Sequence, residues 1–204
     1  MNADFNTNIN ATDDGREFVR EALIRAAGEM LAELGPKAMS VRKVAAKAGV
    51  NHGQVHHYFG GKNGLIQAAM SHLAREHYGN AKKRSGNSPL PAPLTLGEDS
   101  QYLQSLVRLV LDGDLTTATQ EMQTSNSVPL DARKYLERNY PIGEVPVEVK
   151  ARFALSAAIE LGWAALETYI FQLADVNESD KEPVRESARS LAREFWPDEL
   201  KITD

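Results

Sequence analysis

Polar side chains cluster in the segment 51–57, NHGQVHH, where five of seven residues carry groups that can bind metals, bases or phosphates. His52 and His56 are four residues apart, a spacing that places two imidazoles on one helix face and suits a metal ion. The chain has no cysteine, and no carboxylate in the segment could complete such a ligand set. We therefore expect contacts to a nucleic acid here, and neither a metal nor another cofactor.

Two short helices are expected to position this segment. Ser40 is a suitable N-cap for the first helix, because its side chain can accept a hydrogen bond from the first turn. The apolar residues of this helix share one face at helical spacing: Val41, Val44, Ala45 and Ala48. Gly49 then ends the helix, since glycine adopts the left-handed conformation of a tight turn without steric cost.

Asn51 is a suitable N-cap for the second helix, in which Val55 and Phe59 lie four residues apart on the inward face. The outward face is then formed by Gly53, Gln54, His56 and His57. Two helices joined by a glycine-containing turn, with a polar second helix, are typical of a helix-turn-helix that reads DNA.

Residues 20–70 resemble the N-terminal DNA-binding domain of the tetracycline-repressor (TetR) family of transcriptional regulators. The residues that carry the resemblance are Ser40, Ala45–Val50, Gly53, Tyr58, Phe59 and Gly61–Lys62. One position departs from the pattern, because His56 stands where the family usually has a tyrosine that reaches a backbone phosphate. Histidine can donate the same hydrogen bond. The resemblance implies an all-α fold, with an N-terminal three-helix DNA-binding domain and a larger C-terminal helical domain for ligand binding and dimerisation.

The DNA contacts follow from the outward face and the resemblance together. We expect Gln54 and His57 to meet base edges, and Ser40, His56 and Lys62 to meet phosphates. The full set of expected DNA-binding residues is Ser40, Arg42, Asn51, Gly53, Gln54, His56, His57 and Lys62. The expected function is a transcriptional regulator, a repressor released from a palindromic double-stranded operator by a small, largely apolar effector.

The charge is divided along the chain in a way that fits this function. The net charge of the 204 residues is −5, but residues 16–84 hold 12 Lys or Arg and 5 Asp or Glu, a balance of +7. Residues 85–204 hold 11 and 20, a balance of −9. A basic N-terminal part on an acidic remainder suits a polyanion that binds at one end only.

Length and composition permit two domains, since 204 residues with 42% hydrophobic content can build sizeable cores. No apolar run approaches the ~20 residues that cross a bilayer, and the N-terminal residues lack the basic-then-apolar order of a secretion signal. We expect a cytoplasmic protein without a membrane partner. The expected divisions are an arm at 1–15, the DNA-binding domain at 16–62, a connecting helix at 63–84 and the effector-binding and dimerisation domain at 85–204.

Glycine and proline residues indicate where the expected helices end. The first helix should span Arg16 to Leu34 and end at Gly35-Pro36, and residues 85–99 should be an irregular surface connection. Apolar spacing predicts further helices at about 63–83, 103–110, 114–124, 130–140, 146–174 and 182–195.

The segment 146–174 is apolar around most of its circumference, so this helix should be buried on nearly all sides, against its own core and a second subunit. In the family, the last two long helices pair across a two-fold axis. We expect a homodimer with Ala157, Ala164, Leu191 and Phe195 in its interface.

The effector is expected among apolar residues of the C-terminal domain: Leu103, Leu106, Val107, Val110, Met122, Trp163 and Leu166. The same residues could equally fill an ordinary core, because helix faces alone do not distinguish a lined cavity from a filled one. Glu160, Trp163 and Glu167 share a helix face and could anchor an effector, lie in the dimer interface or form a wetted stripe.

Two other classes of function were compared with DNA binding. A helical adaptor that binds another protein would more often carry an apolar patch on the outward face of the second helix, where this chain is polar. A helical enzyme lacks support, since the sequence contains no nucleophile elbow, no phosphate-binding glycine loop and no HExxH motif. The sequence therefore favours the regulator, and it names neither the effector nor the operator.

Overall fold

The computed structural model describes residues 13–86, 88, 90–96, 100–141 and 143–196, and the regular elements of these residues are all helical. The α-helices are α1 Asp13–Ala38, α2 Val41–Lys47, α3 Gly53–Phe59, α4 Lys62–Ser85, α5 Ser100–Leu111, α6 Leu115–Ala118, α7 Val128–Asn139, α8 Val147–Leu173 and α9 Lys181–Ala192. Short 3-10 turns lie at Gln120–Gln123, Glu178–Asp180 and Arg193–Phe195. The predicted all-α class is confirmed. Among the described residues, no helix combines the length and apolar character that crossing a bilayer requires.

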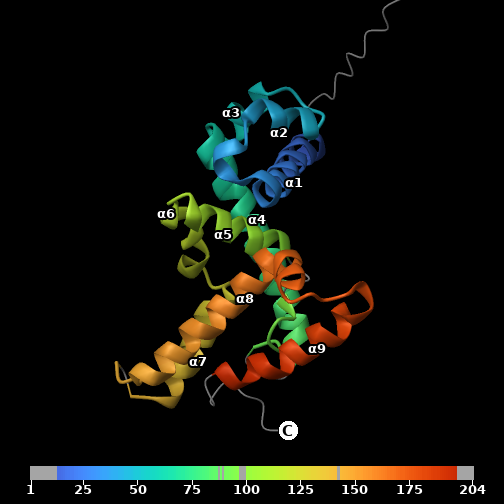
Figure 1. Cartoon of the computed structure of the whole chain (residues 1–204). Coiled ribbons are helices and arrows are strands. Elements are labelled where there is room, and N and C mark those ends of the chain that lie inside the picture. The colour runs from blue at the N-terminus through green and yellow to red at the C-terminus, as the bar shows by residue number, and fades with distance from the viewer. Residues whose placement is uncertain (1–12, 87, 89, 97–99, 142, 197–204) are drawn as a thin grey trace, which may run out of the picture.

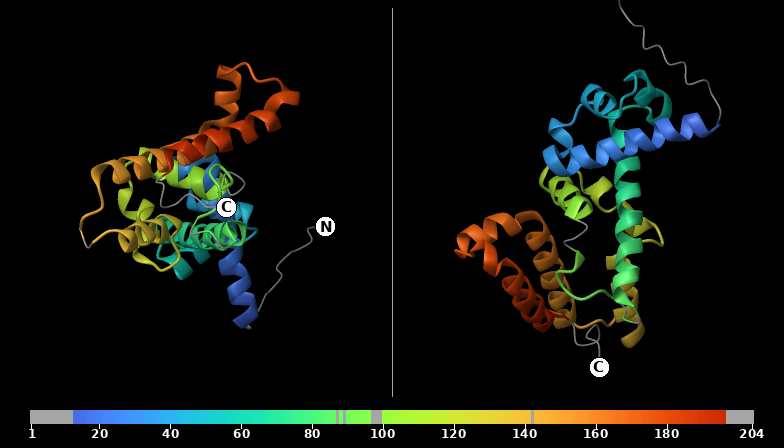
Figure 2. Two further views of the ribbon diagram at one scale, coloured as in Figure 1. Left: turned by 90° about the horizontal axis from the view of Figure 1, so that it is seen from below. Right: turned by 90° about the vertical axis from the view of Figure 1, so that its right-hand side faces the viewer.

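The helices form two regions that α4 joins. Figure 1 shows α1, α2 and α3 together at one end of the molecule, and we call these three helices the reading module. The rest of the described chain after α4, residues 88–196, is called the body here. In the right-hand view of Figure 2, α4 runs from the reading module along one side of the body, while α8 and α9 lie on the other side.

The first helix follows its sequence signals at its C-terminal end. Gly35 has φ 76° and ψ 169°, which interrupts α1, and Pro36 starts a last short turn. The helix buries Leu23, Ala27 and Leu31 completely. Two further apolar residues of the helix, Phe18 in its N-terminal part and Leu34 next to Gly35, are 62% and 45% exposed.

The core of the reading module continues into α4 and α5. The side chains of Val44 and Ala45 from α2 and of Val55 from α3 are almost fully buried, and they pack in one cluster with Leu65 of α4. The same cluster extends to Leu109 of α5. The reading module therefore rests on α4 and α5 through one continuous apolar core, which couples its position to theirs.

The connection between α4 and α5 differs from its prediction as a surface segment. It is irregular where the structure describes it, but its apolar residues are buried: Leu90, Pro91, Pro93, Leu94 and Leu96. Leu94 has a left-handed φ of 57°, and its N–H donates to Oε1 of Glu160 at 2.6 Å. This hydrogen bond from α8 holds the backbone in a conformation that a branched side chain rarely adopts.

Within the single chain, α8 is covered on only part of its circumference, so its expected burial against a second subunit stays a prediction. One face is covered by the body, at Val149, Ser156, Ala164 and Phe171. The large apolar residues of another face are exposed by half or more: Leu155, Leu166, Tyr169 and Leu173. The sequence alone does not distinguish an apolar helix face that is exposed in the single chain from one that is buried in its core.

Candidate functional site

The turn between α2 and α3 forms as the residue types predict. Oγ of Ser40 accepts a hydrogen bond from the N–H of Lys43 at 3.3 Å and caps α2. Gly49 has φ 69°, and the next residue, Val50, donates its N–H to the carbonyl oxygen of Ala45 at 2.9 Å. These contacts close the helix and fix the direction in which α3 begins.

The second helix of the motif begins with the predicted side-chain cap. Oδ1 of Asn51 accepts from the N–H of Gly53 at 2.8 Å, and Gly60 ends α3 with φ 69°. Val55 is fully buried, which fixes the rotation of the helix. Gly53, His56 and His57 are consequently exposed, while Gln54 is half-buried beside them.

The basic side chains of the reading module divide into paired and unpaired ones. Nζ of Lys47 lies 2.7 Å from a carboxylate oxygen of Glu29, and this contact raises the pKa of Lys47. Within the described part of the chain, Arg42 and Lys43 on exposed positions of α2 form no ion pair. The unpaired charge of α2 therefore lies at its N-terminal start, next to the capping residue Ser40.

Lys62 opens α4 beside this surface. Its Nζ donates to the carbonyl oxygen of Lys37 at 3.5 Å, a weak contact of an exposed group that another acceptor can replace. The ring of His56 lies close to Gly61, the residue before Lys62, since a Cβ added there would be 3.7 Å from two of its ring atoms. His56 and Lys62 thus come from different helices but lie at the same junction.

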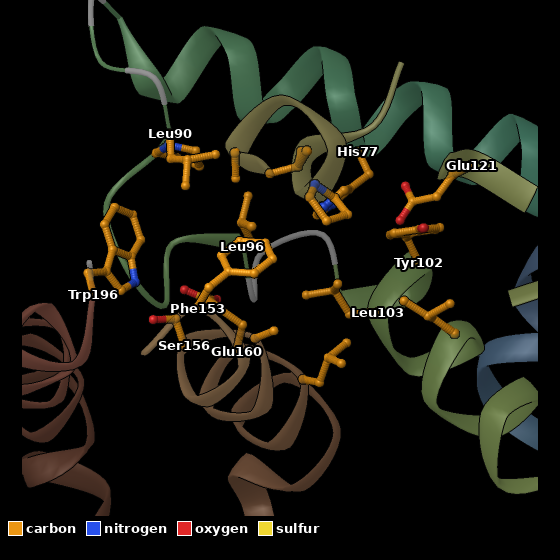
Figure 3. A pocket seen from close by; sticks show the side chains of 17 residues that line it. His77, Leu90, Leu96, Tyr102, Leu103, Glu121, Phe153, Ser156, Glu160 and Trp196 are labelled. Carbon is orange, nitrogen blue, oxygen red and sulfur yellow. The ribbon is translucent and has the colours of Figure 1, made fainter. Parts of the chain in front are cut away.

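The body contains an apolar cavity of about 180 Å³ (Figure 3). It is bordered by α4, the segment 90–96, α5, the 3-10 turn at 120–123, α7, α8 and Trp196, and it is partly open. Its walls include Leu90, Leu96, Leu103, Leu106, Phe153 and Trp196. The volume is below the ~300–1,000 Å³ of pockets for drug-sized ligands, so the cavity suits a small molecule.

Two carboxyl groups reach this cavity. Burial raises the pKa of Glu160 to about 7, although the hydrogen bond from Leu94 N–H opposes the shift. Burial also raises the pKa of Glu121, and it raises that of Tyr102, next to the Glu121 carboxylate. In Figure 3 the side chains of Tyr102 and Glu121 lie together at one end of the cavity, with Trp196 at the other. Each raised pKa reports burial that disfavours the charged form of the group.

The structure places the predicted effector residues in different surroundings. Leu103 and Leu106 line the cavity, whereas five others lie outside its wall: Val107, Val110, Met122, Trp163 and Leu166. Val110, Met122 and Leu166 are exposed by 45%, 38% and 51%. The sequence missed Tyr102, Phe153 and Trp196 as wall residues, because apolar spacing identifies the faces of a helix but not which face borders a void.

Trp163 packs between α8 and α9 instead. Its Nε1 donates to Oε1 of Glu167 at 2.9 Å, and its ring meets Phe171 edge-on with centroids 5.8 Å apart. Arg185 of α9 forms a two-pronged hydrogen bond with Glu167, at 2.9 and 2.8 Å, and lowers the pKa of that carboxyl. The three residues Glu160, Trp163 and Glu167 therefore do not act together. Glu160 lies at the cavity, whereas Trp163 and Glu167 lie at the contact between α8 and α9.

A direct connection joins α5 to the reading module. Nε of Arg108 donates to the carbonyl oxygen of Ala32 in α1 at 2.8 Å. Asp112, just after α5, lies 3.1 Å from Nζ of Lys37 at the end of α1. Since Tyr102, Leu103 and Leu106 of the same helix line the cavity, α5 touches both the cavity and the DNA-binding helices.

The four residues expected in a dimer interface lie in different surroundings. Leu191 and Phe195 are 60% and 46% exposed at the end of α9. Ala157 is exposed and borders the cavity, and Ala164 is 8% exposed and packs in the subunit's own core. The open apolar face of α8 is formed by other residues, among them Leu155, Leu166, Tyr169 and Leu173.

The chain is similar to known regulators in sequence. Residues 23–69 match the model of the family described as bacterial regulatory proteins, tetR family. An HTH-type transcriptional repressor of Mycobacterium tuberculosis is 29% identical over 184 residues, which cover 90% of this chain and 92% of that protein. The HTH-type transcriptional regulator BetI of Stenotrophomonas maltophilia is 47% identical over 57 residues, 28% of this chain and 29% of that protein.

Among solved structures, a tetR-family transcriptional regulator from Streptomyces coelicolor aligns over 88% of this chain and 79% of that chain, with a TM-score of 0.49 and 19% identity. The matched residues 23–69 span the helix-turn-helix, its capping residues and the start of α4, which are the elements whose geometry is described above. Residues 23–69, at the N-terminal end of the chain, therefore belong to the TetR family of transcriptional regulators, as its helix-turn-helix DNA-binding domain.

Proposed function

We propose that this protein is a repressor that binds a palindromic operator as a homodimer and leaves it when a small, largely apolar effector enters the cavity of the body. The observation that carries the proposal is the position of α5, which lines the cavity with Tyr102 and Leu103 and contacts α1 through Arg108. A ligand that displaces α5 would therefore change the position of the reading module. The mycobacterial relative described as a repressor supports the negative sense of regulation.

The proposed base contacts come from the exposed side of α3 and the start of α2. Gln54 and His57 extend from α3, and Gly53 leaves room for the close approach of the duplex. Arg42 extends from α2 without an ion pair, so its guanidinium is available to a base edge or a phosphate.

The proposed phosphate contacts surround this face. Ser40 uses its oxygen to accept from Lys43, and its hydroxyl proton stays available for a phosphate. His56 and Lys62 lie at the α3–α4 junction, and Asn51 at the tight turn. We assign the side chains of Ser40, His56 and Lys62 to phosphates, which set the register of the module on the duplex.

The homodimer is proposed to form through the open faces of α8 and α9. On α8 the open face includes Leu155, Ala158, Gly162, Leu166, Tyr169 and Leu173, a spacing of three and four residues. On α9 the residues Val184, Ala188, Leu191 and Phe195 repeat that spacing. A seam of this kind packs helix against helix, and Gly162 and Ala158 permit a close approach. Ala157 and Ala164 lie outside this seam.

The coupling between effector and DNA is assigned mainly to α5, with α4 as the second link. His77 of α4 stacks on Tyr102 of α5 with ring centroids 4.7 Å apart, so both helices border the cavity. Half-sites of a palindrome lie about 34 Å apart, or a multiple of that distance, so a small rotation of each reading module penalises binding.

The experiment that tests this proposal begins with genomic fragments retained by the purified protein, which define the operator by footprinting. The operator is then titrated with protein while small apolar metabolites are added one at a time. The proposal requires a footprint with two-fold symmetry and at least one compound that weakens operator binding. A symmetric footprint with no compound that changes affinity would retain the DNA contacts and refute the effector mechanism.

A further inference from the structure

We propose that the effector carries a primary ammonium group, which binds at Tyr102, Gln120 and Glu121, and that its apolar body fills the adjoining cavity. The inference rests on the proposed function, because it takes the cavity as the effector site and assigns the chemical class of its ligand. It goes beyond an apolar effector by requiring a small organic cation.

The first observation is a set of three buried oxygen atoms that have no well-formed hydrogen bond within the described residues, although the Tyr102 hydroxyl lies close enough to the Glu121 carboxyl to affect its pKa. These atoms are the hydroxyl oxygen of Tyr102, Oε1 of Gln120 and Oε2 of Glu121. We call these three residues the acceptor corner. Tyr102 is only 3% exposed, so its unpartnered hydroxyl is a group that water does not reach. Buried polar atoms nearly always have a partner, so these three oxygens form a corner that can accept further hydrogen bonds from a donor group.

The second observation is that the acceptor corner borders two spaces. Tyr102 and Glu121 line the apolar cavity, and together with Gln120 they also line a polar hollow of about 290 Å³ between α4 and α6. In Figure 3 the Glu121 carboxylate lies beside Tyr102 at the end of the apolar cavity. A ligand with its polar group in this corner could thus extend its apolar part between α5, α7 and α8.

The third observation is the charge of the surroundings. None of the described residues that line the apolar cavity is Lys or Arg, while Glu121 and Glu160 both reach it. Arg75 lines the polar hollow, but within the described residues it forms no ion pair with Glu121. His77 is the remaining titratable group at the cavity wall, stacked on Tyr102. The site therefore holds two carboxyls for which the structure supplies no neutralising side chain.

A primary ammonium fits these three observations together. It has three N–H donors for the three unpartnered oxygens, and its positive charge offsets the burial of a carboxylate. Burial raises the pKa of Glu121, and a bound cation would act in the opposite direction by stabilising the carboxylate. The ring of Tyr102 lies at the proposed cation, and the rings of Phe153 and Trp196 farther along the cavity suit the apolar body. A neutral alcohol would leave acceptors unsatisfied, and a carboxylate would face two like charges.

The test uses three probes of one shape, 4-phenylbutylamine, 4-phenylbutan-1-ol and 4-phenylbutyrate, with the full-length protein in calorimetric titrations. The amine should bind at least about tenfold more tightly than the alcohol, because charge-assisted hydrogen bonds form only with the amine. Glu121→Gln should remove this preference, and Tyr102→Phe should reduce it. Glu137→Gln, an equal change of charge at an exposed position of α7, should preserve it. Thermal unfolding of each variant checks that it is folded.

The outcomes separate the two proposals. Equal or tighter binding of the alcohol or the carboxylate, no binding of the amine, or a preference that survives in Glu121→Gln overturns the ammonium site. If the alcohol binds and releases operator DNA, effector control stands without the cation. If the amine binds with the expected preference but leaves operator affinity unchanged, the ammonium site stands and the release mechanism is refuted.

Discussion

The reading module and the body differ in how directly their residues determine their geometry. In the module, Ser40, Gly49, Asn51 and Gly60 each fix one local conformation, and the buried Val55 fixes the rotation of α3. In the body, long helices with apolar residues on several faces could pack in more than one rotation. The packing of the body consequently leaves a cavity and an open apolar face, whereas the geometry of the reading module is set by its own local contacts.

The largest expected effect concerns the open faces of α8 and α9. Leu166→Glu places a charge in the proposed seam, at a side chain that is 51% exposed in the single chain, so the subunit should still fold. Loss of the dimer removes the linked second half-site, and operator affinity should fall by about a hundredfold or more. Sedimentation and operator titration measure the two effects.

Gln172→Glu is the matched control for this change, since it adds a charge at an exposed position of α8 outside the seam. It should leave the dimer intact. A Leu166→Glu protein that remains dimeric would place the interface on another surface.

The next effect tests how tightly the module is fixed to α4. A Cβ added at Gly64 would overlap the carbonyl oxygen of Phe59, the last residue of α3, whereas a Cβ at Gly79 on the same helix meets nothing within 4 Å. Gly64→Ala should therefore cost about 3 kcal/mol or more of unfolding free energy and weaken operator binding. Gly79→Ala should stabilise the protein by up to about 1 kcal/mol. Chemical denaturation measures both, and equal stability of the two variants would show that the junction tolerates rearrangement.

The sequence predicted the module more completely than the body, for reasons that particular residues illustrate. The caps and the turn of the module depend on residues close in sequence, so Ser40 and Asn51 have the predicted contacts. On α8, helical spacing groups Glu160 with Trp163, whereas the structure places Glu160 at the cavity, Trp163 against α9 and Leu155 on the open face. Which residues of α8 border the cavity, stay exposed or contact α9 is decided by packing with α5, α7 and α9. Local spacing within α8 contains no information on this packing.

The buried carboxyl of Glu160 in the body predicts that the free energy of unfolding depends on pH. The pKa of Glu160 is raised from 4.5 to about 7, so the folded state holds a proton that the unfolded state releases. The stability that this carboxyl contributes is present below pH 4.5 and is lost as the pH rises to about 7. Wild type should thus lose about 1 to 3 kcal/mol relative to Glu160→Gln across this interval. Unfolding at several pH values measures the difference, and a constant difference would refute the raised pKa.

The smallest effects separate base contacts from phosphate contacts in the module. Gln54→Ala should relax the preference at one base position by about 1–3 kcal/mol, and Lys62→Ala should lower the salt slope by about one unit for all sequences. Arg138→Ala, which removes an exposed basic side chain from α7 in the body, should change neither. Operator variants titrated at several salt concentrations give both quantities. An unchanged salt slope in Lys62→Ala would remove this residue from the phosphate contacts.

The central claim is that occupation of the cavity in the body releases the module from DNA, and filling the cavity with a side chain tests it most directly. Ala157 borders the cavity from an exposed position of α8, so Ala157→Trp can fill it without displacing the core. Lys150→Trp, two turns earlier on the same face and outside the cavity wall, is the control. Operator affinity is measured for both with and without a compound that releases the wild type. Release by the compound should be lost in Ala157→Trp and retained in Lys150→Trp, and equal release from both variants would contradict the claim.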